Sequence, residues 1–199
     1  MAMLVIVSTI VAVRAENIRV VMETSAGNIE LELYADAAPV TVGNFLKYVD
    51  SKYYDNGKFY RVVRMDNQAQ NKIKIEVIQG GRGMKTSQNS FAPIRHETTM
   101  ETGILHKDGV ISMARDKPGS ATSEFFICIN DQPALDFGGK RQPDGQGFAA
   151  FGKVISGMNI IRKIQMVKTD QPVANILEFT SGQMITDPVD IYHINRISD

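Results

Sequence analysis

The sequence predicts a mainly β protein, namely a closed eight-stranded antiparallel β-barrel capped by two α-helices. Three observations favour this fold class. About eight short segments alternate apolar with polar residues or are rich in β-branched and aromatic residues, as strands are. Several of them follow one another through short turns, which is typical of antiparallel neighbours. Two further segments carry apolar residues at helical spacing, which suits helices that cover the ends of a barrel.

Length and composition describe an ordinary globular chain. Its 199 residues suffice for one domain with its own core, and 43% of them are apolar. The 22 basic residues balance the 22 acidic ones, so the charge gives no reason to expect nucleic acid as a partner. Cys128 is the single cysteine, which excludes an intrachain disulfide. Because no His or Cys pair has ligand spacing, no metal or cofactor is expected.

The first 15 residues are expected to form a signal peptide that is cleaved after Ala15. A short apolar run ends in Val13-Arg14-Ala15, which resembles a signal-peptidase site, and the run is too short for a comfortable membrane span. No Lys or Arg precedes it, so a buried strand or an uncleaved anchor stays an alternative. The expected domain is then 16–199, in the periplasm or secreted; without a signal the protein would be cytoplasmic.

A hairpin and a helix are expected first along the domain. Segments 18–24 and 28–34 flank the turn-like sequence Ser25-Ala26-Gly27. In the second segment, apolar residues alternate with glutamates, which predicts one core face and one solvated face. A helix follows from Pro39, and its apolar stripe consists of Val42, Phe45, Leu46 and Val49.

The next two strands, 59–63 and 77–81, bring an arginine and a glutamine towards one patch. Arg61 is flanked by apolar residues and keeps its charge, so it needs water or an acceptor. By itself, this segment also fits a surface arginine that lies along the barrel wall. The polar segment 64–75 suits an exposed loop or a lengthened hairpin.

The second half supplies the remaining strands and helix. Residues 82–108 are expected to form a long loop, and strands are expected at 109–114, 124–130, 148–155 and about 189–197. In 124–130 one face is uniformly apolar, so Phe126 falls on the mixed face, either as a lone exposed ring or as one wall of a binding site. A loop spans 137–147, and a short helix follows Gly157, with Ile160, Ile161 and Ile164 on its apolar face.

Five motifs, in order and in register over about residues 18–197, resemble the cyclophilin family of peptidyl-prolyl cis-trans isomerases. They are Phe59 with Arg61, Val77-Ile78-Gln79-Gly80-Gly81, Gly109-Val110-Ile111-Ser112-Met113-Ala114, Ser120-Ala121-Thr122-Ser123-Glu124-Phe125-Phe126-Ile127 and Phe151-Gly152-Lys153-Val154. The likeness is strongest to the bacterial exported branch. It implies an eight-stranded antiparallel barrel with two capping helices and an active groove on the outside of the barrel.

The resemblance also implies roles for individual residues. Arg61 matches the catalytic arginine, and Gln79 matches the glutamine that supports the arginine and the substrate backbone. Phe126 matches the aromatic floor of the proline pocket. The remaining residues that would bind substrate are Val77, Leu135, Phe148, Phe59 and, through their backbone, Ala114 and Arg115.

Several positions depart from the family pattern. Ala134 stands where many members carry a tryptophan that contacts the inhibitor cyclosporin, so weak cyclosporin binding is expected. Phe148 replaces a histidine that is common in eukaryotic members, and Glu124 replaces a usual glutamine. Residues 64–75 hold roughly ten more residues than the compact family pattern, beside the strand that carries Arg61.

The sequence therefore predicts an isomerase that accelerates X-Pro rotation in folding or secreted proteins. Its partners would be proline-containing flexible polypeptides, and the protein itself is expected to be a monomer. One alternative is a non-catalytic module that binds proline peptides with a chaperone-like role. A hydrolase is a second alternative, but no nucleophile motif frames the candidate residues, which are Ser112, Ser123, His96, His106 and His193.

Overall fold

The structure is a computed structural model that describes residues 17–83, 90–170 and 179–197. The expected signal peptide, residues 1–15, lies outside the described residues, so it stays a prediction. Among the helices of the described ranges, none is long and apolar enough to cross a lipid bilayer.

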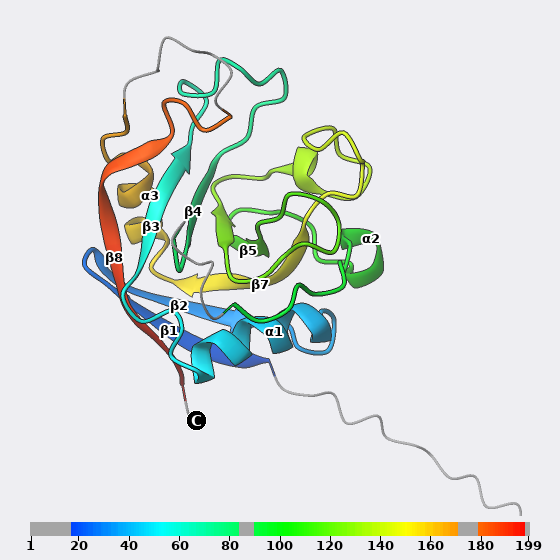
Figure 1. Ribbon diagram of the computed structural model, residues 1–199, viewed down its shortest axis with the longest axis vertical. Coiled ribbons are helices and arrows are strands. Elements are labelled where there is room, and N and C mark those ends of the chain that lie inside the picture. Colours follow the sequence, from blue (N-terminus) through cyan, green and yellow to red (C-terminus); the bar gives the residue numbers. More distant parts are fainter. Residues whose placement is uncertain (1–16, 84–89, 171–178, 198–199) are drawn as a thin grey trace, which may run out of the picture.

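Eight strands close into one antiparallel barrel in the order β1-β2-β7-β5-β6-β4-β3-β8 (Figure 1). This confirms the predicted fold class. The strands are β1 (Ile18–Thr24), β2 (Gly27–Leu33), β3 (Gly57–Val63), β4 (Val77–Gly81), β5 (Val110–Met113), β6 (Phe125–Cys128), β7 (Ala149–Ser156) and β8 (Met184–Arg196).

The core follows the alternation seen in the sequence. In β2 the apolar residues Ile29, Leu31 and Leu33 are fully buried, while the two glutamates between them are half-buried on the outer face. In β6, Phe125 and Ile127 point into the same core. Phe126 belongs to a second apolar cluster on the outside of the barrel, where it is also buried, at 5% exposure. The barrel therefore has an apolar surface on both faces of β6.

Two helices cover the barrel, as predicted. Helix α1 (Pro39–Asp50) packs against β7 and β8, whereas α3 (Met158–Gln165) packs against β2, β3 and β4. The predicted stripe of α1 is buried in full, and so are Ile161 and Ile164 of α3. The four-residue helix α2 (Thr99–Thr102) interrupts the segment 82–108, which was expected to be a loop. A 3₁₀ helix, η1 (Pro133–Leu135), precedes the expected loop 137–147.

A buried carboxylate fixes the start of α1. Glu97, from the long segment before α2, is 2% exposed and accepts hydrogen bonds from Val40 N at 3.1 Å and Thr41 N at 2.8 Å. The Thr41 hydroxyl donates to the same carboxylate at 2.7 Å. These bonds satisfy the amide groups that a helix leaves open at its N-terminus, and a negative charge is favourable there.

The segment between β3 and β4 is more ordered than an exposed loop would be. Gln68 is fully buried, and its amide donates to Arg64 O and Ile75 O, both at 2.7 Å. Its Oε1 accepts from Ile75 N at 3.2 Å and from Arg141 Nη1 at 3.1 Å. The expectation of an exposed loop is therefore wrong at Gln68, because every hydrogen-bonding site of this polar side chain has a partner.

Candidate active site

A groove of about 390 Å³ lies on the outer face of the barrel. Strands β3, β4 and β6 are direct neighbours there, and their register pairs Arg61 with Gln79 and Gln79 with Phe126. The ladder therefore places a cation, an amide and an aromatic ring side by side. The structure brings eight of the nine predicted site residues to this groove: Arg61, Gln79, Phe126, Val77, Leu135, Phe148, Ala114 and Arg115.

Phe59 is the exception, and its predicted role in substrate binding is corrected. It is fully buried in the barrel core, where its ring meets Phe125 edge-on at 5.9 Å. Strict alternation would put residues 59 and 61 on the same face, but the register of β3 shifts between Phe59 and Arg61. This irregularity turns Tyr60 as well as Arg61 towards the groove.

Two amide oxygens hold the Arg61 guanidinium. Gln79 Oε1 accepts from Nη1 at 2.9 Å, and Gln183 Oε1 accepts from Nε at 2.9 Å and from Nη2 at 2.6 Å. The ring of Phe179 lies 5.1 Å from the guanidinium carbon. Burial, together with the charge of Arg141, lowers the pKa of Arg61 to about 10, so the arginine remains charged at neutral pH.

Tyr60 and Glu124 continue the hydrogen bonds that begin at Arg61. Gln79 Nε2 donates to the Tyr60 hydroxyl at 2.9 Å, and that hydroxyl donates to Glu124 Oε2 at 2.7 Å. The other carboxylate oxygen accepts from Arg82 N at 3.0 Å and Ser123 Oγ at 3.1 Å. Burial raises the pKa of Glu124 in spite of these bonds. Burial and the nearby Glu124 charge raise the pKa of Tyr60 as well.

The apolar half of the groove is built around Phe126. The ring of Phe148 meets it edge-on, with centroids 5.2 Å apart and an interplanar angle of 89°. The other apolar lining residues are Val63, Ile75, Val77 and Leu135. A small apolar ring can therefore be held between aromatic and aliphatic walls, within one groove with the Arg61 cation.

His106 packs against Phe126, the predicted floor of the proline pocket. The ring of His106 stacks on Phe126, with centroids 5.9 Å apart, and its nitrogens lie 2.7 Å from Asp136 Oδ1 and 3.0 Å from Ser112 Oγ. This Asp-His-Ser order resembles that of a hydrolase. However, Ser112 is fully buried and His106 is 1% exposed. A substrate acyl group has no access to this hydroxyl, so the network positions the floor ring instead.

The other hydrolase candidates do not approach the groove as catalytic groups. His96 Nε2 lies 3.1 Å from Gln146 O, and burial lowers the pKa of this histidine. His193 pairs with Glu23 on the outside of the barrel at 3.3 Å. Ser123 is fully buried, and its hydroxyl is directed to Glu124. Among the described residues, the groove lining does not include His96, His193 or Ser123.

At the far end of the groove, Arg115 presents its backbone rather than its side chain. The side chain is 0% exposed and binds Asp144 at 2.7 Å and Gly147 O at 2.9 Å, whereas the residue as a whole is half-buried. The exposed part of Arg115 is therefore its main chain. Ala114, the preceding residue, lines the same wall. Ala114 N already donates to Glu124 O at 2.8 Å, so the main chain of these residues that faces the groove includes the Ala114 carbonyl but not its N–H.

Among the residues that sequence reasoning missed are Tyr60 and Phe179, which line the groove, and the buried Gln183, which contacts Arg61. Tyr60 could not be assigned because one sequence gives no sign of a strand irregularity. Gln183 contacts Arg61 across 122 positions of the chain, and no local pattern reports a contact of that range. Phe179 has an indirect signal, since it is a large aromatic residue in a stretch with no strand or helix pattern.

Comparisons with known proteins agree with this geometry. The model of the family "Cyclophilin type peptidyl-prolyl cis-trans isomerase/CLD" matches residues 19–193. "Peptidyl-prolyl cis-trans isomerase A" of Dickeya dadantii is 40% identical over 163 residues, which cover 79% of this chain and 77% of that protein. A peptidyl-prolyl cis-trans isomerase of Acinetobacter baylyi is 38% identical over 157 residues, with 77% and 74% of the two chains covered.

Among solved structures, a cyclophilin-type isomerase of Cryptosporidium parvum, crystallised in the presence of the dipeptide Ala-Pro, shares the fold. Its TM-score is 0.67 at 22% sequence identity, and the match covers 91% of this chain and 99% of the other. Fungal and plant proteins also match this chain.

Replacing Glu124 by Gln should stabilise the protein at neutral pH and have less effect in acid. Burial raises the pKa of Glu124 above its ordinary value of 4.5, so the folded protein binds this proton more tightly than the unfolded chain does. The wild-type protein therefore loses stability as the pH rises from about 4.5 through the raised pKa, and the variant has no such proton to lose. Urea denaturation of both proteins between pH 4 and pH 8 measures the difference; parallel curves would contradict the expectation.

Proposed function

The chain belongs to the cyclophilin-type peptidyl-prolyl cis-trans isomerase family, and we propose that Arg61 and the Phe126 pocket accelerate rotation about X-Pro bonds. The single observation that carries this proposal is the shared groove. A half-buried, charged guanidinium and an apolar pocket lie on three adjacent strands, at paired positions of the ladder.

The reaction needs stabilisation of a twisted amide and no covalent chemistry. Resonance gives the peptide C–N bond a rotation barrier of about 18–20 kcal/mol, and uncatalysed X-Pro rotation takes tens of seconds or more. Only interactions that are stronger in the twisted state than in the planar state lower this barrier. In the twisted state the prolyl nitrogen regains its lone pair and becomes a hydrogen-bond acceptor. A donor beside that nitrogen therefore acts on the transition state.

Arg61 is suited to be this donor. A guanidinium has five N–H groups, and three of those on Arg61 are used by Gln79 and Gln183. The described residues accept from three of the five N–H groups, so two remain available to a substrate. Both acceptors are neutral, so they orient the cation without cancelling its charge. In a groove with little water, such a preorganised donor acts strongly on a developing lone pair.

The pocket would hold the proline ring while the preceding residue turns. Phe126 supplies the floor and Phe148 an edge-on wall. The backbone of Ala114 and Arg115 would bind the extended chain on one side of the proline. The solved relative that was crystallised with Ala-Pro supports a proline-containing ligand for this fold. Flexible polypeptides with accessible X-Pro bonds are the proposed substrates.

Replacing Arg61 by Ala should lower kcat/KM for an X-Pro peptide by two to three orders of magnitude, on the scale of losing one preorganised donor. A protease-free assay that follows cis-trans exchange by NMR measures this directly. Arg162→Ala is the matched control, because Arg162 pairs with Asp108 on an exposed helix face. Near-wild-type turnover of Arg61→Ala would contradict the proposed role of the guanidinium.

Cyclosporin should bind weakly, and Ala134→Trp should tighten its binding. Ala134 is half-buried beside Leu135 at the apolar end of the groove, where many family members carry an indole that contacts this inhibitor. Its methyl group buries far less apolar surface than an indole does. Titration calorimetry on the wild type and the variant tests this, and tight binding by the wild type would overturn it.

We also propose that the protein is exported, which would make secreted or periplasmic proteins its clients. The support is the apolar run that ends in Val13-Arg14-Ala15. Mass spectrometry of the protein expressed from its full sequence should then find a mature chain that begins at Glu16. A mature protein that retains residues 1–15 would contradict cleavage.

A further inference from the structure

Gln183 binds the guanidinium of Arg61 along one whole edge. Its Oε1 accepts from Nε at 2.9 Å and from Nη2 at 2.6 Å, while Gln79 accepts from Nη1 on the other side. The plane of the guanidinium is therefore fixed from two directions. Gln183 is fully buried, so this contact is made away from bulk water, where a hydrogen bond restricts motion most effectively.

The chemical type of this acceptor matters as much as its position. A carboxylate is the usual partner for the Nε and Nη2 edge of an arginine, because its two oxygens accept two parallel bonds. A carboxylate here would also place a negative charge next to the donor and weaken the attraction of Arg61 for a developing lone pair. The amide of Gln183 orients the same edge and leaves the positive charge in place.

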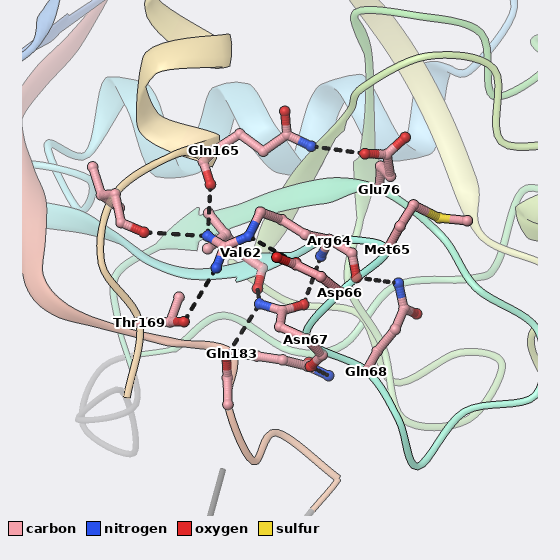
Figure 2. A network of polar contacts seen from close by, with 12 residues as sticks. Val62, Arg64, Met65, Asp66, Asn67, Gln68, Glu76, Gln165, Thr169 and Gln183 are labelled. Atoms are coloured by element: carbon pink, nitrogen blue, oxygen red, sulfur yellow. Dashed lines mark hydrogen bonds and ion pairs between the residues drawn. The ribbon is translucent and has the colours of Figure 1, made fainter. Parts of the chain in front are cut away.

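The extra segment between β3 and β4 holds Gln183 in position (Figure 2). Asn67 Nδ2 donates to Val62 O at 3.0 Å and to Gly182 O at 3.1 Å. The Asn67 side chain thus connects Val62, which follows Arg61 in β3, to Gly182, which precedes Gln183. Gln183 itself accepts from Val62 N at 2.9 Å through its carbonyl, and its side-chain amide reaches Asn67 O at 3.4 Å.

Arg64 fixes this turn to the end of α3. Asn67 Oδ1 accepts from Arg64 N at 2.7 Å, which closes the turn. The Arg64 side chain donates through Nη1 to Gln165 O at 2.9 Å and to Val167 O at 3.2 Å. Carbonyl groups at the C-terminal end of a helix lack partners within the helix, and a cation is favourable there. Figure 2 shows Arg64 between α3 and the turn.

We propose that residues 64–75 act as a brace for the active site, in which Arg64 and Asn67 hold Gln183 against Arg61, and that Gln183 is a positioning residue for the isomerase reaction. This inference rests on the proposed function of Arg61. The brace gives a purpose to a segment that the compact family pattern lacks. Arg64 and Asn67 act on the orientation of the donor, whereas Ile75, at the end of the same segment, lines the apolar part of the groove.

Two substitutions of Gln183 separate orientation from charge. Gln183→Leu removes the acceptor, so the kcat for an X-Pro peptide should fall by up to about a hundredfold, the scale of misplacing a reacting group. KM should change less than about twofold, since the proline pocket is untouched. Gln183→Glu keeps an acceptor at the same place but adds a counter-charge, and its kcat should fall on the order of tenfold.

The NMR signal of the Arg61 Nε–H group gives a readout of position that does not depend on turnover. This signal should be protected from exchange with water in the wild type and in Gln183→Glu, and should lose protection in Gln183→Leu. Gln132→Leu is the matched control for loss of a buried side-chain amide, because that amide donates to Ile129 O and does not contact Arg61. Its kcat and its Nε–H signal should equal those of the wild type.

The outcomes distinguish this inference from the proposed function. If Arg61→Ala abolishes turnover while folded Gln183→Leu and Gln183→Glu both keep wild-type kcat, Gln183 has no positioning role and the inference falls alone. If Arg61→Ala keeps its turnover, the proposed function falls first. Should Gln183→Leu fail to fold, Gln183→Glu decides: a wild-type kcat for that variant would overturn the charge argument.

Discussion

The active groove depends on a half-buried guanidinium that is held by neutral partners. Removing an arginine from water is unfavourable, and buried arginines are usually paired with carboxylates. Here burial lowers the pKa of Arg61 while two amide oxygens accept three of its N–H groups. The hydrogen bonds offset part of the cost of desolvation, and the charge is not cancelled. In the proposed mechanism, this donor serves a substrate atom that becomes an acceptor only during rotation.

The barrel determines which groups share the groove. Arg61, Gln79 and Phe126 occupy paired positions on β3, β4 and β6, so their relative placement follows from backbone hydrogen bonds of the sheet. A closed barrel has no free edge at which these strands could slip. The position of Gln183 has a different origin, because it comes from the residues just before β8 and is held by side-chain contacts with Asn67 together with a backbone bond from Val62 N.

This difference explains how far the sequence could be used for prediction. Strands β1, β2 and β4 and helix α1 follow from local alternation or helical spacing, and the closed barrel follows from their number and turns. Eight groove residues followed from the resemblance to the cyclophilin family. Phe59 was misplaced because a shift in strand register leaves no mark in residue types. Gln183 was missed because its partner Arg61 lies 122 positions away. Gln68 was missed although Arg64 and Ile75 are near in sequence, because the type of a polar residue does not show whether the fold will bury it with partners.

The strand ladder and the contacts of Gln183 position different parts of the groove, and these parts can vary separately. Substitutions in the ladder change the pocket and the arginine together, since each strand is paired with its neighbour. Substitutions in the segment 64–75 or before β8 can turn the guanidinium while Phe126 and Phe148 stay in place. In the proposed mechanism, the ladder therefore controls the binding of a proline, and Gln183 with its contacts controls the orientation of the guanidinium. The lengthened connection next to β3 leaves the pairing of β3, β4 and β6 in place, and its Asn67 contacts Gln183, which in turn accepts from Arg61.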